Sequence, residues 1–304
     1  MMKKIILLSL LLFLVNFAWA QDDLLDELVL ENKKATPVLA TFKGTRIITG
    51  QSNENISKKH LNFLVLHRFG ELKDDAWYYS LLGFDNATVR LAFDYGITDK
   101  LMVGIGRSGG LKIYDMSAKY KIAQQTIGGK RNFPIAISYY GNVGINTTTF
   151  PDLTRDNYFT SRLSFCNQLI FARKFNDKVS IQITPTMVHR NLVEKISTPN
   201  DIYALGLAGS FKITRSTRLN IEYYPRLNGR DLTTKSGLAY NDYLGIGVDI
   251  ETGGHVFQLM FSNSTYMYEQ GFVTETTGKW SDFGVRLGFN LSRTFSFDKE
   301  VKHK

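Results

Sequence analysis

Apolar residues alternate with polar or small residues along much of this chain, and a period of two is typical of a β-strand with two different faces. The clearest example runs from Phe283 to Leu291, where every odd position is apolar and every even position is glycine or polar. Similar alternation occurs over residues 88–95, 219–223 and 243–250. Nine alternating positions are enough for a tilted strand to cross a bilayer, so each segment is a candidate transmembrane strand.

The alternation predicts twelve strands in all. They are expected at about 58–68, 87–97, 100–107, 111–122, 134–146, 161–174, 178–189, 202–213, 217–226, 239–250, 255–263 and 282–297. The first is the weakest prediction, because Leu61 to Leu66 is apolar on both parities. Ten or fourteen strands remain open alternatives, but an even number leaves both ends of the domain on one side of a membrane.

A soluble antiparallel sandwich also alternates, and the connections favour a barrel instead. Tight turns near 98–99, 176–177, 215–216 and 253–254 alternate with longer polar loops at about 70–85, 147–159, 190–200, 227–237 and 264–281. Short turns on one side and long loops on the other are typical of bacterial outer-membrane barrels. The last strand ends on Phe295 and Phe297, an aromatic ending by which barrel-assembly machinery is expected to bind it. We therefore predict an all-β, antiparallel transmembrane β-barrel.

The N-terminus has the pattern of a secretory signal peptide. Lys3 and Lys4 precede an apolar run from Ile5 to Val15, and Ala18-Trp19-Ala20 supplies a cleavage site before Gln21. The apolar run is short for a retained anchor, and a glutamine after the site does not indicate a lipoprotein. We expect export to the outer membrane after cleavage near Ala20-Gln21.

The mature chain then divides into three parts. An acidic leader and an extended segment fill residues 21–57, the barrel fills 58–297, and a polar tail fills 298–304. The alternation does not decide whether the extended segment from Thr41 to Gly50 pairs with the barrel, plugs its lumen or lies beneath it. Residues 21–50 are also a candidate binding segment for a periplasmic partner.

Composition agrees with a strand-rich chain, since aromatic residues make up 13% and proline occurs only 6 times. The formal charge of +9 falls to +7 without Lys3 and Lys4, and its basic residues form no compact run. An exported chain meets little nucleic acid, so a basic lumen or attraction to anionic outer-membrane lipid is the better interpretation.

Charged residues within the predicted strands lie on the less apolar parity. A charge facing lipid at mid-bilayer costs about 2–4 kcal/mol, so these side chains are expected to face the lumen whatever the function. They would either form a selective constriction or fill the lumen as ion pairs. The ten candidates are Arg90, Asp94, Asp115, Lys119, Lys121, Arg162, Lys212, Glu222, Asp249 and Arg286.

Motifs for other chemistry are weak. Gly104 to Gly109 matches the dinucleotide-binding fingerprint by letter, but a strand follows it where the fingerprint requires a helix. The five histidines show no metal-ligand spacing, and His67 is the one for which a hydrolase triad can be imagined. The single Cys166 is expected to be a small buried or lumen-facing residue. We predict no enzyme activity, cofactor or metal.

Several stretches resemble an uncharacterised outer-membrane β-barrel family of Bacteroidota. They are Ala40 to Arg46, His67 to Gly70, Asp94 to Leu101 and Val103 to Ser108. The resemblance extends over nearly all of the mature chain, and it implies location and fold but no activity or catalytic residue.

Three functions follow as hypotheses. The first is a narrow or gated passive channel for small polar or anionic solutes, because twelve strands lie between the filled small barrels and the wide porins. The second is a non-conducting barrel that binds a partner through its long loops or acidic leader. The third, an enzyme built on a barrel, has no local signature.

Overall fold

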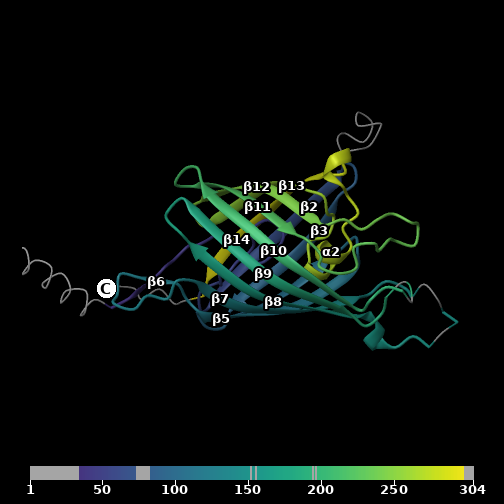
Figure 1. The fold of residues 1–304 in the computed structure, drawn as a ribbon, viewed down its shortest axis with the longest axis horizontal. Coiled ribbons are helices and arrows are strands. Elements are labelled where there is room, and N and C mark those ends of the chain that lie inside the picture. Colours follow the sequence, from purple (N-terminus) through teal and green to yellow (C-terminus); the bar gives the residue numbers. More distant parts are fainter. Residues whose placement is uncertain are drawn as a thin grey trace, which may run out of the picture. The chain divides into compact units, whose positions relative to one another are not determined.

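Twelve strands form a closed antiparallel barrel (Figure 1), as the alternation predicts. The computed structural model describes residues 34–72, 83–150, 153–154, 156–193, 195 and 197–297, so the predicted signal peptide, nearly all of the acidic leader and the polar tail lie outside it. The barrel strands are β2 (His60–Glu71), β3 (Thr88–Gly96), β4 (Leu101–Ser108), β5 (Ile113–Ala123), β7 (Ala136–Asn146), β8 (Leu163–Lys174), β9 (Val179–Arg190), β10 (Asp201–Lys212), β11 (Thr217–Tyr224), β12 (Tyr243–Thr252), β13 (His255–Ser262) and β14 (Arg286–Ser296).

Each strand pairs with its neighbour in the chain, and the last closes the barrel on the first. β14 pairs with β2 in a register that sets Phe289 opposite His67, with an irregularity between Arg286 and Gly288. Every strand of the barrel is therefore hydrogen-bonded to a neighbouring strand on both sides, and no sheet edge is free.

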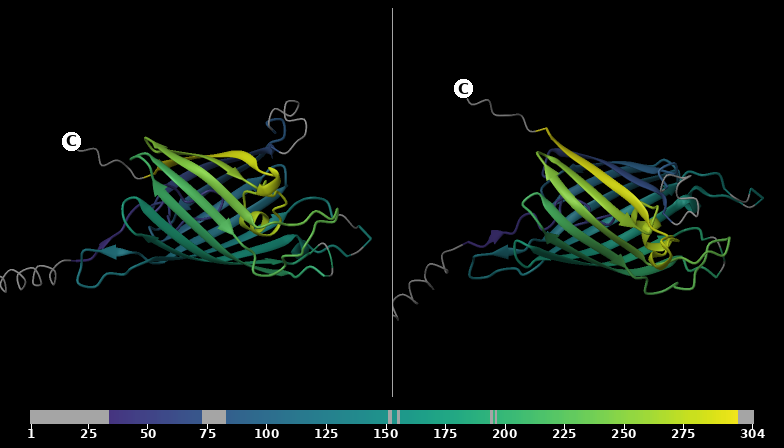
Figure 2. Two further views of the ribbon diagram at one scale, coloured as in Figure 1. Left: turned by 45° about the horizontal axis from the view of Figure 1, so that its top comes forward. Right: turned by 90° about the horizontal axis from the view of Figure 1, so that it is seen from above.

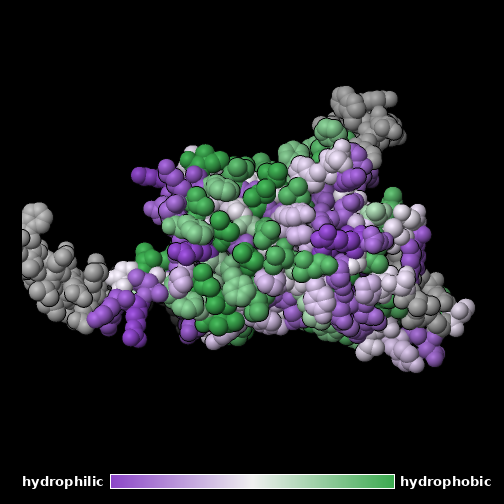
Figure 3. Space-filling model, in the orientation of Figure 1, coloured by the Kyte–Doolittle hydropathy of each residue, from purple (hydrophilic) through white to green (hydrophobic). Residues whose placement is uncertain are grey.

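The two faces of the barrel are inverted relative to a soluble protein. Outward side chains such as Leu91, Ile105 and Leu259 are 47%, 53% and 52% exposed, whereas Lys119 and Glu222 are fully buried on the inward parity. Figure 3 shows hydrophobic residues gathered over the strands and hydrophilic ones toward the ends. An apolar surface of this extent is stable in lipid and not in water, so the barrel is a membrane barrel.

Its two ends differ in the length of their connections. We call one the turn end, with connections at 97–100, 175–178, 213–216 and 253–254, and the other the loop end, with connections at 72–87, 147–162, 191–200, 225–242 and 263–285. The prediction of short and long connections is confirmed with two exceptions, the short loop-end connection at 109–112 and the long connection at 124–135 between β5 and β7. Within the described ranges, no helix is long and apolar enough to cross a membrane.

Two strands begin later in the structure than the sequence predicts. β14 begins at Arg286, because a short 3₁₀ helix (η2, Trp280–Asp282) and the left-handed Phe283, with a φ of 56°, bend the chain away first. β12 begins at Tyr243 instead of 239, where the preceding residues form part of the loop-end connection. In both cases a loop residue happens to continue the alternation of the strand that follows it.

A small second unit comprises the described residues up to Leu39 together with residues 124–135. In it β1 (Thr36–Pro37) pairs with β6 (Thr126–Ile127), and Val38 N donates to Gln125 O over 2.8 Å. The end of the leader therefore pairs with the connection between β5 and β7.

Candidate functional site

The lumen of the barrel is filled by the chain itself. Residues 40–57, which we call the plug, form a finger that turns back on itself at Ile47–Gly50. Ile47 N donates to Gly50 O over 3.0 Å, and Ser52 N donates to Thr45 O over 2.9 Å. Of the three positions that the sequence left open for this segment, plugging the lumen is the correct one.

The tip of the plug is held by one carboxylate on β11. Thr49 N and Gly50 N both donate to Glu222 Oε2, over 2.9 and 3.0 Å. The Thr49 hydroxyl accepts hydrogen bonds from Arg68 Nη2 at 3.1 Å and from the Tyr243 hydroxyl at 2.7 Å. A negative group thus binds two backbone N–H groups, the charge-assisted arrangement that is stronger than a neutral hydrogen bond.

Polar side chains hold the rest of the plug from all around the barrel. Lys119 on β5 donates to Gln51 Oε1 and Ser52 O, over 3.1 and 3.0 Å. Further contacts come from Asp94 on β3, Gln182 on β9, Arg218 on β11, Gln258 on β13 and Asn290 on β14. On β4, Met102 Sδ accepts from Ile56 N over 3.5 Å. With Arg68, Glu222 and Tyr243, nine of the twelve strands contact the plug through side chains, so it crosses the lumen and does not lie along one wall.

A second segment closes the barrel from the loop end. The connection 263–285 turns inward and carries the short helix α2 (Glu269–Thr274), whose six residues are all buried. The Phe272 ring packs on the rings of Tyr224 and Tyr243, with centroids 5.1 and 4.8 Å away. Figure 2 shows α2 among the loop-end strand termini.

The two closures meet in a buried ion pair. Arg46 of the plug binds Glu269 of α2 over 3.0 Å, and their side chains are 5% and 0% exposed. Gln51 Nε2 donates to the same carboxylate oxygen over 3.0 Å. Because an unpaired charge here would be costly to bury, the plug and α2 stabilise each other.

The structure brings several of the predicted lumen charges together. Asp94, Lys119 and Glu222 contact the plug directly. Arg90 and Asp115 form a buried ion pair of 2.6 Å on the wall. Asp249 accepts from Gln258 Nε2 over 2.9 Å, and Gln258 in turn binds the plug.

Other predicted charges lie near the ends of strands. Lys121 and Lys212 are half-buried toward the turn end of β5 and β10. Arg286 opens β14 at the loop end and pairs with Glu71 over 2.8 Å. Among the described residues, these three side chains form no hydrogen bond or ion pair with the plug, and they lie at the rims of the lumen.

Arg162 is a correction to the predicted set. It lies in a 3₁₀ helix (η1, Phe159–Arg162) before β8 and not within the strand. Its guanidinium donates to Asn146 O at 2.9 Å and lies 3.9 Å from the centroid of the Phe150 ring. Arg162 therefore holds the β7–β8 connection at the loop end and lines no constriction in the lumen.

Sequence reasoning missed residues whose roles depend on contacts across the barrel. Arg68 is fully buried although it follows an apolar run, and Arg46 and Glu269 become partners across 223 residues. The apolar run itself, the reason for doubting the first strand, has an explanation. Leu64 and Leu66 face inward, where they form a buried cluster with Ala92 and Met267 of the inturned loop.

The glycine motif, His67 and Cys166 all lie in strands of the barrel. Gly104 to Ser108 lies in β4, with a turn after it. His67 faces outward, where its ring lies 4.9 Å from Phe289 and 4.3 Å from Phe69. Cys166 is buried on the inner wall, as predicted. Among the residues described, no group of three or more His, Cys, Asp or Glu side chains could hold a metal ion.

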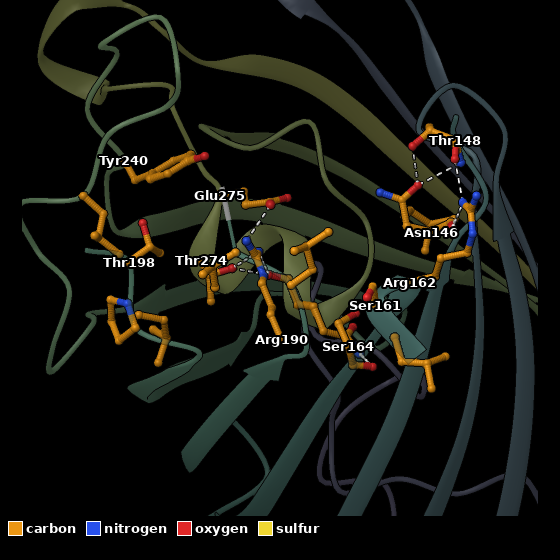
Figure 4. Close-up of a pocket in the computed structure, with 18 of the residues that line it drawn as sticks. Asn146, Thr148, Ser161, Arg162, Ser164, Arg190, Thr198, Tyr240, Thr274 and Glu275 are labelled. Carbon is orange, nitrogen blue, oxygen red and sulfur yellow. Dashed lines mark hydrogen bonds and ion pairs between the residues drawn. The ribbon is translucent and has the colours of Figure 1, made fainter. Parts of the chain in front are cut away.

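A pocket of 660 Å³ opens at the loop end (Figure 4), a volume within the range of small-molecule sites. Arg190 on β9 faces it, paired with Glu275 over 2.6 Å and bonded to Thr274. Gln270, Thr274 and Glu275 line the pocket, so α2 and the residue after it contribute to the wall. Burial raises the pKa of the Tyr268 phenol, another lining residue, well above its ordinary value, and the group stays neutral.

Comparison with known proteins identifies the family. The family described as membrane bound beta barrel domain (DUF5777) matches residues 42–295, and the chain belongs to it. The match includes nearly the whole plug as well as the barrel. No curated protein matches the chain.

Solved structures with a similar arrangement include the NanC porin, with 7% identity, a TM-score of 0.46, and coverage of 79% of this chain and 100% of that one. The KdgM porin has 9% identity, a TM-score of 0.44 and coverage of 79% and 99%. An outer membrane channel from Pseudomonas putida F1 has 12% identity, a TM-score of 0.47 and coverage of 80% and 98%.

Proposed function

We propose that this member of the membrane-bound β-barrel family is a gated channel of the outer membrane, held closed by the plug, that passes small polar solutes when the plug is displaced. A closed antiparallel barrel with an apolar outer face, short turns at one end and long loops at the other suits that membrane. The observation that carries the proposal is the way in which the plug is bound. Side chains of nine strands hold it, and the barrel sheet closes without it.

Displacement of the plug is physically reasonable because the barrel side chains hold it mostly through hydrogen bonds. Water can replace each hydrogen bond at a net cost of about 0.5–1.5 kcal/mol for a neutral pair and about 1.5–3 kcal/mol where one partner is charged, as at Glu222 and Lys119. The plug also enters and leaves at the turn end, where Arg218 binds Thr41 O at 3.2 Å and Lys58 forms a bridge with Gly96. It can therefore withdraw toward the turn end without breaking the barrel.

The wall beside the plug is suited to a hydrated path. Buried oxygens of Ser138, Gln168, Ser180 and Gln182 on β7 to β9 have no hydrogen-bond partner among the described residues. Buried polar atoms of this kind are normally satisfied by water. A polar solute would meet hydrogen-bonding groups along this wall once the plug has moved.

The charges on the inner wall are balanced. Around the plug, the basic residues are Arg68, Arg90, Lys119 and Arg218, and the acidic ones are Asp94, Asp115, Glu222 and Asp249. Lys121, Lys212 and Arg286 add basic charge only at the rims. A balanced wall does not select strongly for anions, so the basic charge of the whole chain is a poor guide to selectivity. We propose that the open channel passes small polar solutes of either positive or negative charge.

Two deletions test the proposal in a planar bilayer. A mature chain that begins at Lys58 lacks the plug, and a matched chain that begins at Ala40 lacks the leader but keeps the plug. We expect steady, salt-dependent single-channel currents from the first chain and a closed barrel with rare openings from the second. A heat-dependent gel shift confirms that each variant is folded.

Silence from a folded barrel without the plug would contradict the channel. It would favour the non-conducting barrel, in which α2 and the filled wall close the lumen permanently. The leader would then bind its periplasmic partner through residues 21–39, since residues 40–50 of that candidate segment are enclosed in the plug.

A further inference from the structure

The loop-end pocket has the composition of a binding site for an organic anion. Its basic lining residues are Arg162, Arg190 and Lys235, and its acidic lining residue is Glu275. Three basic groups against one acidic group leave an excess of positive charge at this point, unlike the balanced wall of the lumen. A cavity lined by cations favours a ligand of opposite charge.

The remaining lining mixes neutral polar side chains with an apolar part. The apolar part is the one that a ligand body can contact. It comes from β5, β8 and β10 and from the connections that follow β9 and β11. These residues are Ile113, Leu163, Leu192, Val193, Ile202 and Leu232. Apolar side chains beside placed polar and charged groups are common in small-molecule sites. The pocket therefore suits a ligand with an apolar body and one anionic group.

Both arginines are held in position before any ligand arrives. Arg162 donates to Asn146 O at 2.9 Å and Thr148 O at 2.5 Å, so two carbonyls fix its guanidinium. Arg190 is fixed by Glu275 and by Gln270 O at 3.2 Å. In Figure 4 Arg190 points toward Thr274 and Glu275, while Arg162 lies by Asn146 and Thr148. Positioned groups lose little freedom on binding, which raises affinity.

We propose that this pocket binds a small amphipathic carboxylate, with its anionic group at Arg190 and its apolar body against Leu163, Ile202 and Leu232. Arg162 adds positive charge to the pocket beside Asn146 and Thr148. Glu275 occupies Arg190 in the absence of ligand and competes with the carboxylate for it. The geometry thus assigns opposite effects to the two members of one ion pair. Loss of Arg190 weakens binding, and loss of the Glu275 charge strengthens it.

The test measures binding of 4-phenylbutyrate to the full mature protein in lipid nanodiscs by isothermal titration calorimetry. Its neutral isostere 4-phenylbutanamide has the same body without the charge. We expect the acid to bind at least tenfold more tightly than the amide, because a charged partner strengthens its hydrogen bonds to arginine. Equal affinity for the two probes, or no binding of either to a folded protein, would overturn the proposal.

Four variants locate the site. We expect Arg190→Met to weaken binding of the acid about tenfold and Glu275→Gln to strengthen it severalfold. Arg162→Met, which removes a charge farther along the pocket, should weaken binding less than Arg190→Met. Arg107→Met is the matched control, because Arg107 is exposed on β4 and lies over the Tyr114 ring outside the pocket. A weaker affinity in Glu275→Gln would mean that the ion pair only supports the loops, and would overturn the competition. These readings need no current, so they stand or fall separately from the channel.

Discussion

Glu222 shows how one residue can hold a whole segment in place. Its carboxylate lies in a strand that faces the lumen and accepts two backbone N–H groups from the tip of the plug. Hydrogen bonds to a charged group contribute about 1.5–3 kcal/mol each, more than a neutral pair. The tip fits this carboxylate because Gly50 has no side chain. A methyl group at Gly50 would stand 2.5 Å from Glu222 Oε1 and 2.6 Å from the Tyr224 hydroxyl.

Gly50→Ala should therefore displace the tip without touching a strand of the barrel. We expect the frequency of channel opening to rise about tenfold, the effect of losing roughly 1.4 kcal/mol of the closed state. Gly44→Ala is the control in the same segment, because its methyl group would lie 3.8 Å from the nearest neighbour, Arg46 O. If single-channel recordings show the same opening frequency for both variants, the contact between Glu222 and the tip of the plug does not hold the channel closed.

At the scale of elements, the plug and α2 form a joint closure supplied from opposite ends of the barrel. The plug depends on polar contacts, while α2 places Phe272 in an aromatic cluster with Tyr224 and Tyr243. Arg46 and Glu269 connect the two. Removing one partner of a buried pair costs about 3–5 kcal/mol, because it leaves a charge without compensation.

The pair predicts strong coupling between substitutions. Arg46→Gln and Glu269→Gln should each increase the open probability. The double variant should have an open probability only slightly above that of either single variant, because each single substitution already breaks the pair. Lys43→Gln is the control on the same segment, because its pair with Glu251 is partly exposed and contributes little. Additive effects of the two buried substitutions on open probability, in a double-mutant cycle, would show that the closures act independently.

The strands were predictable from the sequence because the environment of each side chain, lipid or lumen, determines whether that residue is apolar or polar. Residues such as Leu91 and Leu259 face lipid while the next residue faces the lumen, so a period of two appears locally. Arg162 was misplaced for the same reason, since it continues the pattern of β8 although the strand begins one residue later. Local alternation identifies a strand well and its first residue poorly.

The candidate site was less predictable, because it is built from contacts between distant parts of the chain. The plug mixes apolar and polar residues without a period, and side chains of nine strands determine where it lies. Glu269 and Phe272 sit in a long loop whose composition does not distinguish an inturned helix from an exposed one. The charges of the wall could be chosen by parity, but their partners, such as Thr45 for Asp94, required the structure.

The whole molecule has two levels of stability. Backbone pairing closes the barrel completely, with an apolar outer face that lipid stabilises. The plug, in contrast, is held mainly by side-chain hydrogen bonds and carries a small apolar contact through Phe42, Ile47 and Ile48. Elements with less buried apolar contact open at lower free energy than the rest of the fold. The closure should therefore be the first part of the described structure to open.

The most direct test of this account is the current through the intact mature chain in a planar bilayer as urea is raised and then removed. We predict stepwise currents at urea concentrations where the heat-dependent gel shift still reports a folded barrel, and loss of those currents when urea is washed out. The chain that begins at Lys58 should conduct throughout and respond little to urea. A closed barrel at every concentration below the unfolding of the strands would contradict the account, because the plug would then be part of the barrel core and no gate.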